Sequence, residues 1–137
     1  DRGMRDAPRM AILLKALGVT PDRILSSPAR RALTTATFFA EELGIPPAEI
    51  WVEPRIYDAY PEDIISLLQE LPDEYKEVLI FGHNPTFTLL ANSFGGPGTD
   101  NVPTCGIFRV DAAIDQWVQL SESRGRVMQY LFPKANE

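Results

Sequence analysis

Apolar residues recur at helical spacing in four stretches of this chain, and each stretch predicts a helix with one buried face. The first helix is expected from about Asp6 to Leu17, with Asp6 as its cap and Gly18 as its end. The apolar stripe of this helix should consist of Ala7, Met10, Ala11, Leu14 and Leu17.

The second helix is predicted to follow Ser27, which has the character of a cap, with Pro28 in the first helical position and Gly44 at its end. A third helix is expected from about Pro61 to Leu71, and a fourth from Thr86 to about Phe94. The buried face of the second helix should consist of Ala32, Ala36, Phe39, Ala40 and Leu43.

Short apolar segments lie between and after these helices, and their length predicts strands. The run Val78–Phe81 is apolar throughout, which is typical of a strand buried on both faces of a parallel sheet. Strands that alternate with helices favour an α/β fold, with a mostly parallel sheet and helices on both faces. The expected strands are Arg23–Ser26, Glu49–Glu53, Val78–Phe81, Ile107–Asp111 and Val127–Phe132.

Composition restricts the number of domains and the classes of partner. The 137 residues are enough for one domain, and the 45% hydrophobic and 23% charged content is that of an ordinary globular protein. Thirteen Lys and Arg against nineteen Asp and Glu give a net charge of −6, which argues against nucleic acid or an anionic membrane surface as the main partner. The longest apolar run, Met10–Leu14, is far shorter than a membrane span.

The chain contains one histidine, His83, and one cysteine, Cys105. A single cysteine excludes an internal disulfide, and the pair cannot form a structural zinc site, so neither metal nor cofactor is expected. Cys105 has no second histidine to activate it, so it is not expected to be a nucleophile. The absence of disulfides is compatible with the cytoplasm, where we expect the protein to act as a monomer.

Two segments share the order strand, polar turn, helix: residues 24–32 and residues 78–85. In open α/β sheets ligands bind beyond the carboxyl ends of the strands, and helix N-termini favour anions. Arg30 and Arg31 lie in the first predicted turn of a helix, where cations are disfavoured by up to about 1 kcal/mol. A bound phosphate would reverse this penalty, because the planar fork of Arg accepts two of its oxygens.

The residues alone leave other interpretations open. Taken alone, Arg30 and Arg31 are more often solvated surface residues, and a lone histidine such as His83 more often forms a structural hydrogen bond. The segment Gly82–Pro85 is also what a capped turn requires, with Asn84 as the cap and Pro85 in the first helical position.

Taken together, these segments resemble a known family. Residues 27–36, Ser-Pro-Ala-Arg-Arg-Ala-Leu-Thr-Thr-Ala, resemble the Ser-Pro-x-x-Arg-Ala-x-Gln-Thr-Ala signature of the histidine phosphatase superfamily, and residues 82–85 resemble its second-histidine motif. The short chain, residues 2–7 before the first helix and Pro-Thr-Cys-Gly at 103–106 are similar to SixA-type phosphohistidine phosphatases. The resemblance covers essentially the whole chain in the right order, with Thr34 in the place of the usual Gln.

The resemblance implies a phosphoglycerate mutase-like α/β/α sandwich of three layers, with one strand antiparallel to the rest; Ile107–Asp111 is the candidate for that strand. It assigns phosphate binding and catalysis to Arg31 and His83, with Asn84 also at the phosphate.

A general acid is harder to assign. The nearest carboxylates are Glu53 and Asp58, beside the end of the strand that contains Trp51, and both are also compatible with plain surface charges.

The family's first strand ends in Arg-His, and its histidine becomes phosphorylated. Nothing in residues 1–137 matches this element. We therefore expect residues 1–137 to form a single histidine-phosphatase-like domain that lacks its N-terminal strand and loop. The alternative is a natural variant without a nucleophile.

Three functions are compatible with the sequence. The first is a phosphatase that acts on phosphohistidine, on a His-containing phosphotransfer domain, through a covalent phosphohistidine intermediate. The second is a phosphatase of small phosphorylated metabolites on the same scaffold, and the third is a non-catalytic phosphate-binding module. A compact chain without long insertions has little to enclose a small substrate, which favours a protein substrate.

Overall fold

The computed structural model describes residues 2–96, 98, 102–103 and 105–133. Within these residues the chain alternates helices with strands, as the hydrophobic pattern predicts. The helices are α1 (Arg2–Ala16), α2 (Arg30–Glu42), α3 (Pro61–Gln69) and α4 (Thr86–Ser93). The strands are β1 (Arg23–Ser26), β2 (Trp51–Val52), β3 (Val78–Phe81), β4 (Ile107–Ala112) and β5 (Gly125–Leu131).

The start of α1 differs from the prediction. The helix already includes Arg2, so Asp6 lies inside it and is buried rather than capping it. The stripe from Ala7 to Leu14 is buried as expected, but Leu17 is 48% exposed. Since Leu17 follows the last helical residue, it is no longer held on the buried face, and Gly18 turns the chain away with a φ of +80°.

The start of α2 was also predicted too early. Helical geometry begins at Arg30, and the Ser27 hydroxyl accepts a hydrogen bond from the backbone N–H of Ala29, which precedes the helix. The predicted end is confirmed, because Gly44 adopts a φ of +77° just beyond the helix. The strand expected over residues 49–53 shortens to β2, because the preceding Pro47–Glu49 segment forms a 3-10 turn.

The strands form two sheets. One is parallel, in the order β2-β1-β3, and the other is the antiparallel pair β4-β5. The mixed α/β fold with a mostly parallel sheet is thus confirmed. The antiparallel pairing expected for Ile107–Asp111 occurs with β5, in a second sheet, rather than within one continuous sheet.

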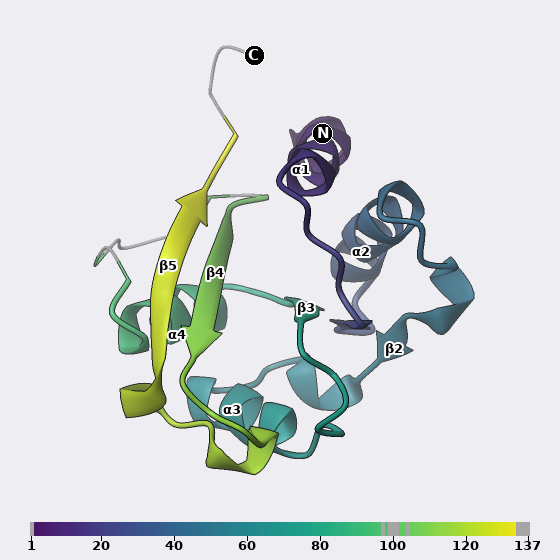
Figure 1. The fold of residues 1–137 in the computed structure, drawn as a ribbon. Helices are drawn as coiled ribbons and strands as arrows, with labels where there is room; N and C mark the ends of the chain where they lie inside the picture. Colours follow the sequence, from purple (N-terminus) through teal and green to yellow (C-terminus); the bar gives the residue numbers. More distant parts are fainter. Residues whose placement is uncertain (1, 97, 99–101, 104, 134–137) are drawn as a thin grey trace.

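Side chains on successive strand positions point to opposite layers, as the period of a strand requires. In β3, Val78 and Ile80 pack into the cluster formed with α3 and α4, whereas Leu79 and Phe81 face α1 and α2. Figure 1 shows α1 and α2 together on one side of the molecule and α3 and α4 on the other. Residues of β4 and β5 contribute to the same clusters on both sides, so the two sheets occupy one layer between the helices.

A cavity of about 870 Å³ interrupts this layer, and residues of both β3 and β4 line it. Among the described residues, β3 pairs with β1 alone and β4 pairs with β5 alone, so each has an unpaired edge. The β3 residues are consequently half-buried, whereas full burial was predicted. None of the helices in the described part of the chain is long and apolar enough to cross a membrane.

Candidate active site

The carboxyl ends of β1 and β3 bring Ser27 and His83 together. Ser26 pairs with Phe81 in the parallel register, and the Ser27 N–H donates to the Phe81 carbonyl at 3.0 Å. The two segments that follow β1 and β3 leave the sheet at this level. The Ser27 Oγ and the His83 Nε2 lie 2.7 Å apart, which is a short hydrogen bond between two elements 56 residues apart in sequence.

Arg31 lies in the first turn of α2. It is exposed, and its guanidinium forms no ion pair with a carboxylate of the described residues. Arg31, His83 and Asn84 are among the residues that line the large cavity, whereas Arg30 is not. Both residues that the resemblance assigned to phosphate binding thus line the same cavity, and their joint role at a phosphate stays a prediction.

The ring of His83 is held in place by close packing. Tyr57 packs edge-on against it, with ring centroids 5.6 Å apart, and is 55% exposed at the surface. Gly82 precedes His83 where a Cβ atom would lie 2.6 Å from the ring of Phe87 and 2.9 Å from Ile56 Cγ2. Only glycine fits this position without displacement of its neighbours.

Asn84 has partners on both sides of its amide. Its nitrogen donates to the Val102 carbonyl at 2.8 Å. Its Oδ1 accepts from the Thr88 N–H at 3.1 Å and from the Thr88 hydroxyl at 2.8 Å. These contacts tie the loop after β3 to α4 and favour a structural role for the side chain; its predicted contact with phosphate stays a prediction.

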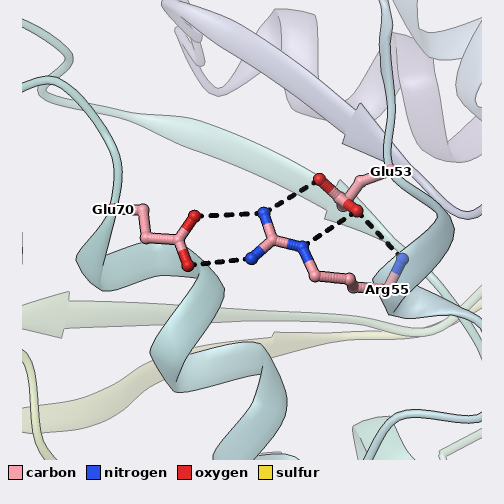
Figure 2. Close-up of polar contacts among 3 residues, drawn as sticks. All are labelled: Glu53, Arg55 and Glu70. Atoms are coloured by element: carbon pink, nitrogen blue, oxygen red, sulfur yellow. Dashed lines mark hydrogen bonds and ion pairs between the residues drawn. The ribbon is translucent and has the colours of Figure 1, made fainter.

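Glu53 is part of an ion-pair network, which Figure 2 shows. Its carboxylate is largely buried and accepts three hydrogen bonds from Arg55, whose guanidinium also binds Glu70. The side-chain hydrogen bonds from Arg55 hold the pKa of the Glu53 carboxyl below its usual value. A carboxylate held ionised in this way is poorly suited to donate a proton, so the contacts argue against Glu53 as the general acid.

Asp58, the other predicted acid, lies on the exposed loop next to Tyr57. Its backbone is left-handed, with a φ of +57°, a conformation that Asp adopts more readily than most residues. No ion pair with another described residue holds its carboxylate. Asp58 follows Tyr57, which contacts His83, but it does not line the cavity, so its role as the acid stays a prediction.

The thiol of Cys105 is an unsuitable nucleophile. Burial, and secondly the nearby carboxylate of Asp6, raise the pKa of the thiol, so it stays protonated at neutral pH. Within the residues that the structure describes, no group of three or more His, Cys, Asp or Glu side chains is placed to hold a metal ion. Of the segment at 103–106, residue 104 lies outside the described residues.

Sequence reasoning did not identify the contacts that Ser27 and Tyr57 make with His83. A usable signal was present for Ser27, since residues that directly follow two paired parallel strands emerge side by side. No comparable signal exists for Tyr57, because it follows a two-residue strand and a 3-10 turn at Pro54–Ile56.

Comparisons with known proteins agree with this fold. The chain is 28% identical to the uncharacterized protein ML1117 of Mycobacterium leprae, over 97% of this chain and 84% of that protein. No family model matches the sequence. A solved structure assigned as the phosphohistidine phosphatase SixA of Agrobacterium tumefaciens is 28% identical, with a TM-score of 0.75 over 93% of this chain and 78% of that one.

Two further structures have the same fold. The protein histidine phosphatase SixA in complex with tungstate is 26% identical, with a TM-score of 0.72 over 91% of this chain and 77% of its own. A protein from Nakamurella multipartitia assigned as SixA is 16% identical, with a TM-score of 0.76 over 96% and 81% of the two chains. The resemblance to the histidine phosphatase superfamily, and to its SixA type, is confirmed. A phosphatase of the histidine phosphatase type is the class of function that these likenesses support.

Proposed function

We propose that this protein is a phosphohistidine phosphatase that acts on a His-containing phosphotransfer domain through a covalent phosphohistidine intermediate. The observation that carries the proposal is the position of Arg31 and His83 on one cavity, at the carboxyl ends of the parallel strands. The tungstate complex of a SixA structure supports it, because tungstate is a tetrahedral oxyanion like phosphate.

Arg31 and His83 have complementary parts in phosphoryl transfer. The guanidinium of Arg31 binds two oxygens of the phosphoryl group, and the N-terminus of α2 adds a favourable dipole. A ring N–H of His83 donates to a third oxygen. Together they neutralise the charge that is spread over these oxygens in the transition state, while the chemistry itself requires a separate nucleophile.

We place that nucleophile on a strand that precedes residue 1 and fills the cavity between β3 and β4. The unpaired edges that β3 and β4 present among the described residues support this placement, as does the apolar lining of much of the cavity. A strand parallel to β3 would end at the same edge of the sheet as His83. An Arg-His pair at its end would then face Arg31 across the site.

The proposed reaction has two steps. The nucleophilic imidazole nitrogen forms a bond to phosphorus while the phosphorus–nitrogen bond of the substrate breaks, and the departing histidine takes up a proton. Asp58 is the candidate donor of that proton. Water then attacks phosphorus, which releases inorganic phosphate and restores the imidazole.

The test begins with the coding sequence directly upstream of residue 1, which should encode a strand that ends in Arg-His. With that segment included, the protein should release phosphate from a phosphorylated phosphotransfer domain. Arg31→Ala and His83→Asn should each lower kcat by roughly 100-fold or more, as removal of a transition-state hydrogen-bond donor does elsewhere. Arg30→Ala is the matched control and should change kcat by less than about threefold, as a surface charge does.

Different results would lead to different conclusions. Wild-type turnover in Arg31→Ala or His83→Asn refutes their assignment. Faster hydrolysis of small phosphomonoesters than of the phosphotransfer domain favours the metabolite phosphatase. If no Arg-His precedes residue 1, the covalent mechanism is refuted, and tungstate binding that depends on Arg31 without turnover would indicate a phosphate-binding module.

A further inference from the structure

Ser27 forms the hydrogen bond that sets the state of His83. We propose that Ser27 is a positioning residue. Its hydroxyl donates a hydrogen bond to Nε2 of neutral His83, so the neutral ring carries its proton on Nδ1. The Nδ1–H is then the group that His83 presents to a phosphoryl oxygen. The contact with a phosphoryl oxygen rests on the proposed function, whereas the assignment of the tautomer does not.

The buried hydroxyl of Ser27 has few hydrogen-bond partners. Ser27 is 0% exposed, and a serine hydroxyl has one proton and two lone pairs. The Ala29 N–H donates to one lone pair at 3.2 Å. A buried hydroxyl proton requires an acceptor, and the acceptor that the described residues supply is the Nε2 of His83 at 2.7 Å. Nε2 must then be unprotonated in the neutral ring.

The opposite tautomer has a definite cost. If Nε2 carried the proton, it would donate to the second lone pair of the Ser27 Oγ. The hydroxyl proton would then have no acceptor among the described residues, in a place that water does not reach, and an unsatisfied buried polar group destabilises the state that contains it. The hydrogen bond at one ring nitrogen therefore fixes the proton on the other.

The consequence for binding is that the Nδ1–H donor does not depend on the charge of the ring. Both the neutral tautomer and the imidazolium carry a proton on Nδ1. Tyr57 packs edge-on against His83 and is followed in the chain by Asp58, and Arg31 of α2 lines the same cavity as His83. Arg31 keeps its charge throughout, so a phosphoryl group meets a constant set of donors.

The tautomer can be measured without any assay of activity. Two-bond ¹H–¹⁵N correlation spectra distinguish Nδ1–H from Nε2–H imidazole. The signals of His83 are identified as those that are missing from the spectrum of His83→Asn. At about pH 9, well above the ordinary histidine pKa of roughly 6.5, the wild-type spectrum should show the Nδ1–H pattern. An Nε2–H pattern in the wild-type protein overturns the proposal, whatever the variants do.

The variants test the cause. Ser27→Ala should shift the signals of His83 away from the Nδ1–H pattern, and Ser27→Thr, which keeps the hydroxyl, should restore it. Ser26→Ala is the matched control: Ser26 is equally buried, but its hydroxyl donates to the Ser27 carbonyl at 2.9 Å and not to His83. An unchanged pattern in Ser27→Ala, or the same change in Ser26→Ala, would show that Ser27 does not set the tautomer.

The pH dependence of kcat separates this proposal from the proposed function. Ser27→Ala should lower kcat several-fold where the ring is neutral and little where it is protonated, because the imidazolium carries both N–H groups in any case. An inactive wild-type protein with the Nδ1–H pattern refutes the phosphatase and leaves the tautomer standing. An active wild-type protein with the Nε2–H pattern refutes the tautomer and leaves the phosphatase standing.

Discussion

Replacement of Glu53 by Gln tests whether this carboxylate holds the fold or donates a proton. Glu53 is 8% exposed and accepts from the Arg55 backbone N–H at 2.9 Å, from Nε at 3.1 Å and from Nη2 at 3.0 Å. Glutamine has nearly the same shape, but it loses the charge, and its amide nitrogen would face guanidinium donors. The substitution therefore removes charge-assisted hydrogen bonds without creating a cavity.

The expected loss of stability is about 1–2 kcal/mol. One hydrogen bond to a charged group contributes about 1.5–3 kcal/mol when buried. The side chain of Arg55 is 52% exposed, and it keeps its hydrogen bonds to Glu70, so water replaces much of what is lost. Glutamine also keeps one acceptor oxygen, so the net effect should lie near the lower end of the range for one such bond.

The effect should depend on pH in one direction. Side-chain hydrogen bonds from Arg55 lower the pKa of Glu53 in the folded state below its unfolded value, so its contribution is complete above the unfolded pKa of about 4.3. The contribution is lost as the pH falls through the lower folded pKa. The difference in stability between the wild-type protein and Glu53→Gln should therefore be full at pH 7 and shrink at acidic pH.

Urea unfolding, followed by the fluorescence of Trp51 and Trp117, measures this difference. Glu70→Gln is the matched control, because Glu70 binds the same guanidinium from a fully solvated position. It should have a much smaller effect than Glu53→Gln. Equal midpoints for the wild-type protein and Glu53→Gln would refute the structural role. A kcat lowered by 100-fold or more with unchanged stability would instead identify Glu53 as the general acid.

Two other substitutions test the surroundings of the site. Gly82→Ala should lower the free energy of unfolding by roughly 1–3 kcal/mol and shift the NMR signals of His83, because the added methyl group collides with Phe87. Unchanged stability and unchanged signals would contradict that packing. Cys105 should react slowly with a thiol reagent at pH 7 and faster in Asp6→Asn, because the Asp6 carboxylate helps to raise the pKa of the thiol. Equal labelling rates in the two proteins would count against this influence.

The sequence predicted correctly those strands and helix ends that are determined by neighbouring residues. Residues 23–26 and 78–81 are strands as predicted, since short apolar segments between helix signals leave few alternatives. The helix ends near Gly18 and Gly44 were predictable for a similar reason, because few other residues adopt a positive φ without strain.

The errors occur where contacts between distant residues override local preference. Asp6 has the residue type of a cap, but α1 extends beyond it and buries it. Ser27 was interpreted as a cap from its neighbours, whereas its hydroxyl binds His83, 56 residues later. For Glu53, whose role as the acid stays a prediction, no pattern in the sequence indicates the network with Arg55 and Glu70 that argues against that role.

The contacts around His83 have a further consequence for how binding and chemistry can be separated. Ser27 fixes one ring nitrogen, Tyr57 packs against the ring, and the close packing at Gly82 fixes the backbone, all within the described residues. None of these contacts requires a nucleophile. A site organised in this way should bind an oxyanion with little rearrangement, since the geometry is already established before the ligand arrives. Loss of tungstate binding in Arg31→Ala and His83→Asn would therefore test the binding part of the proposal, and turnover would test the nucleophile that the proposed strand would add.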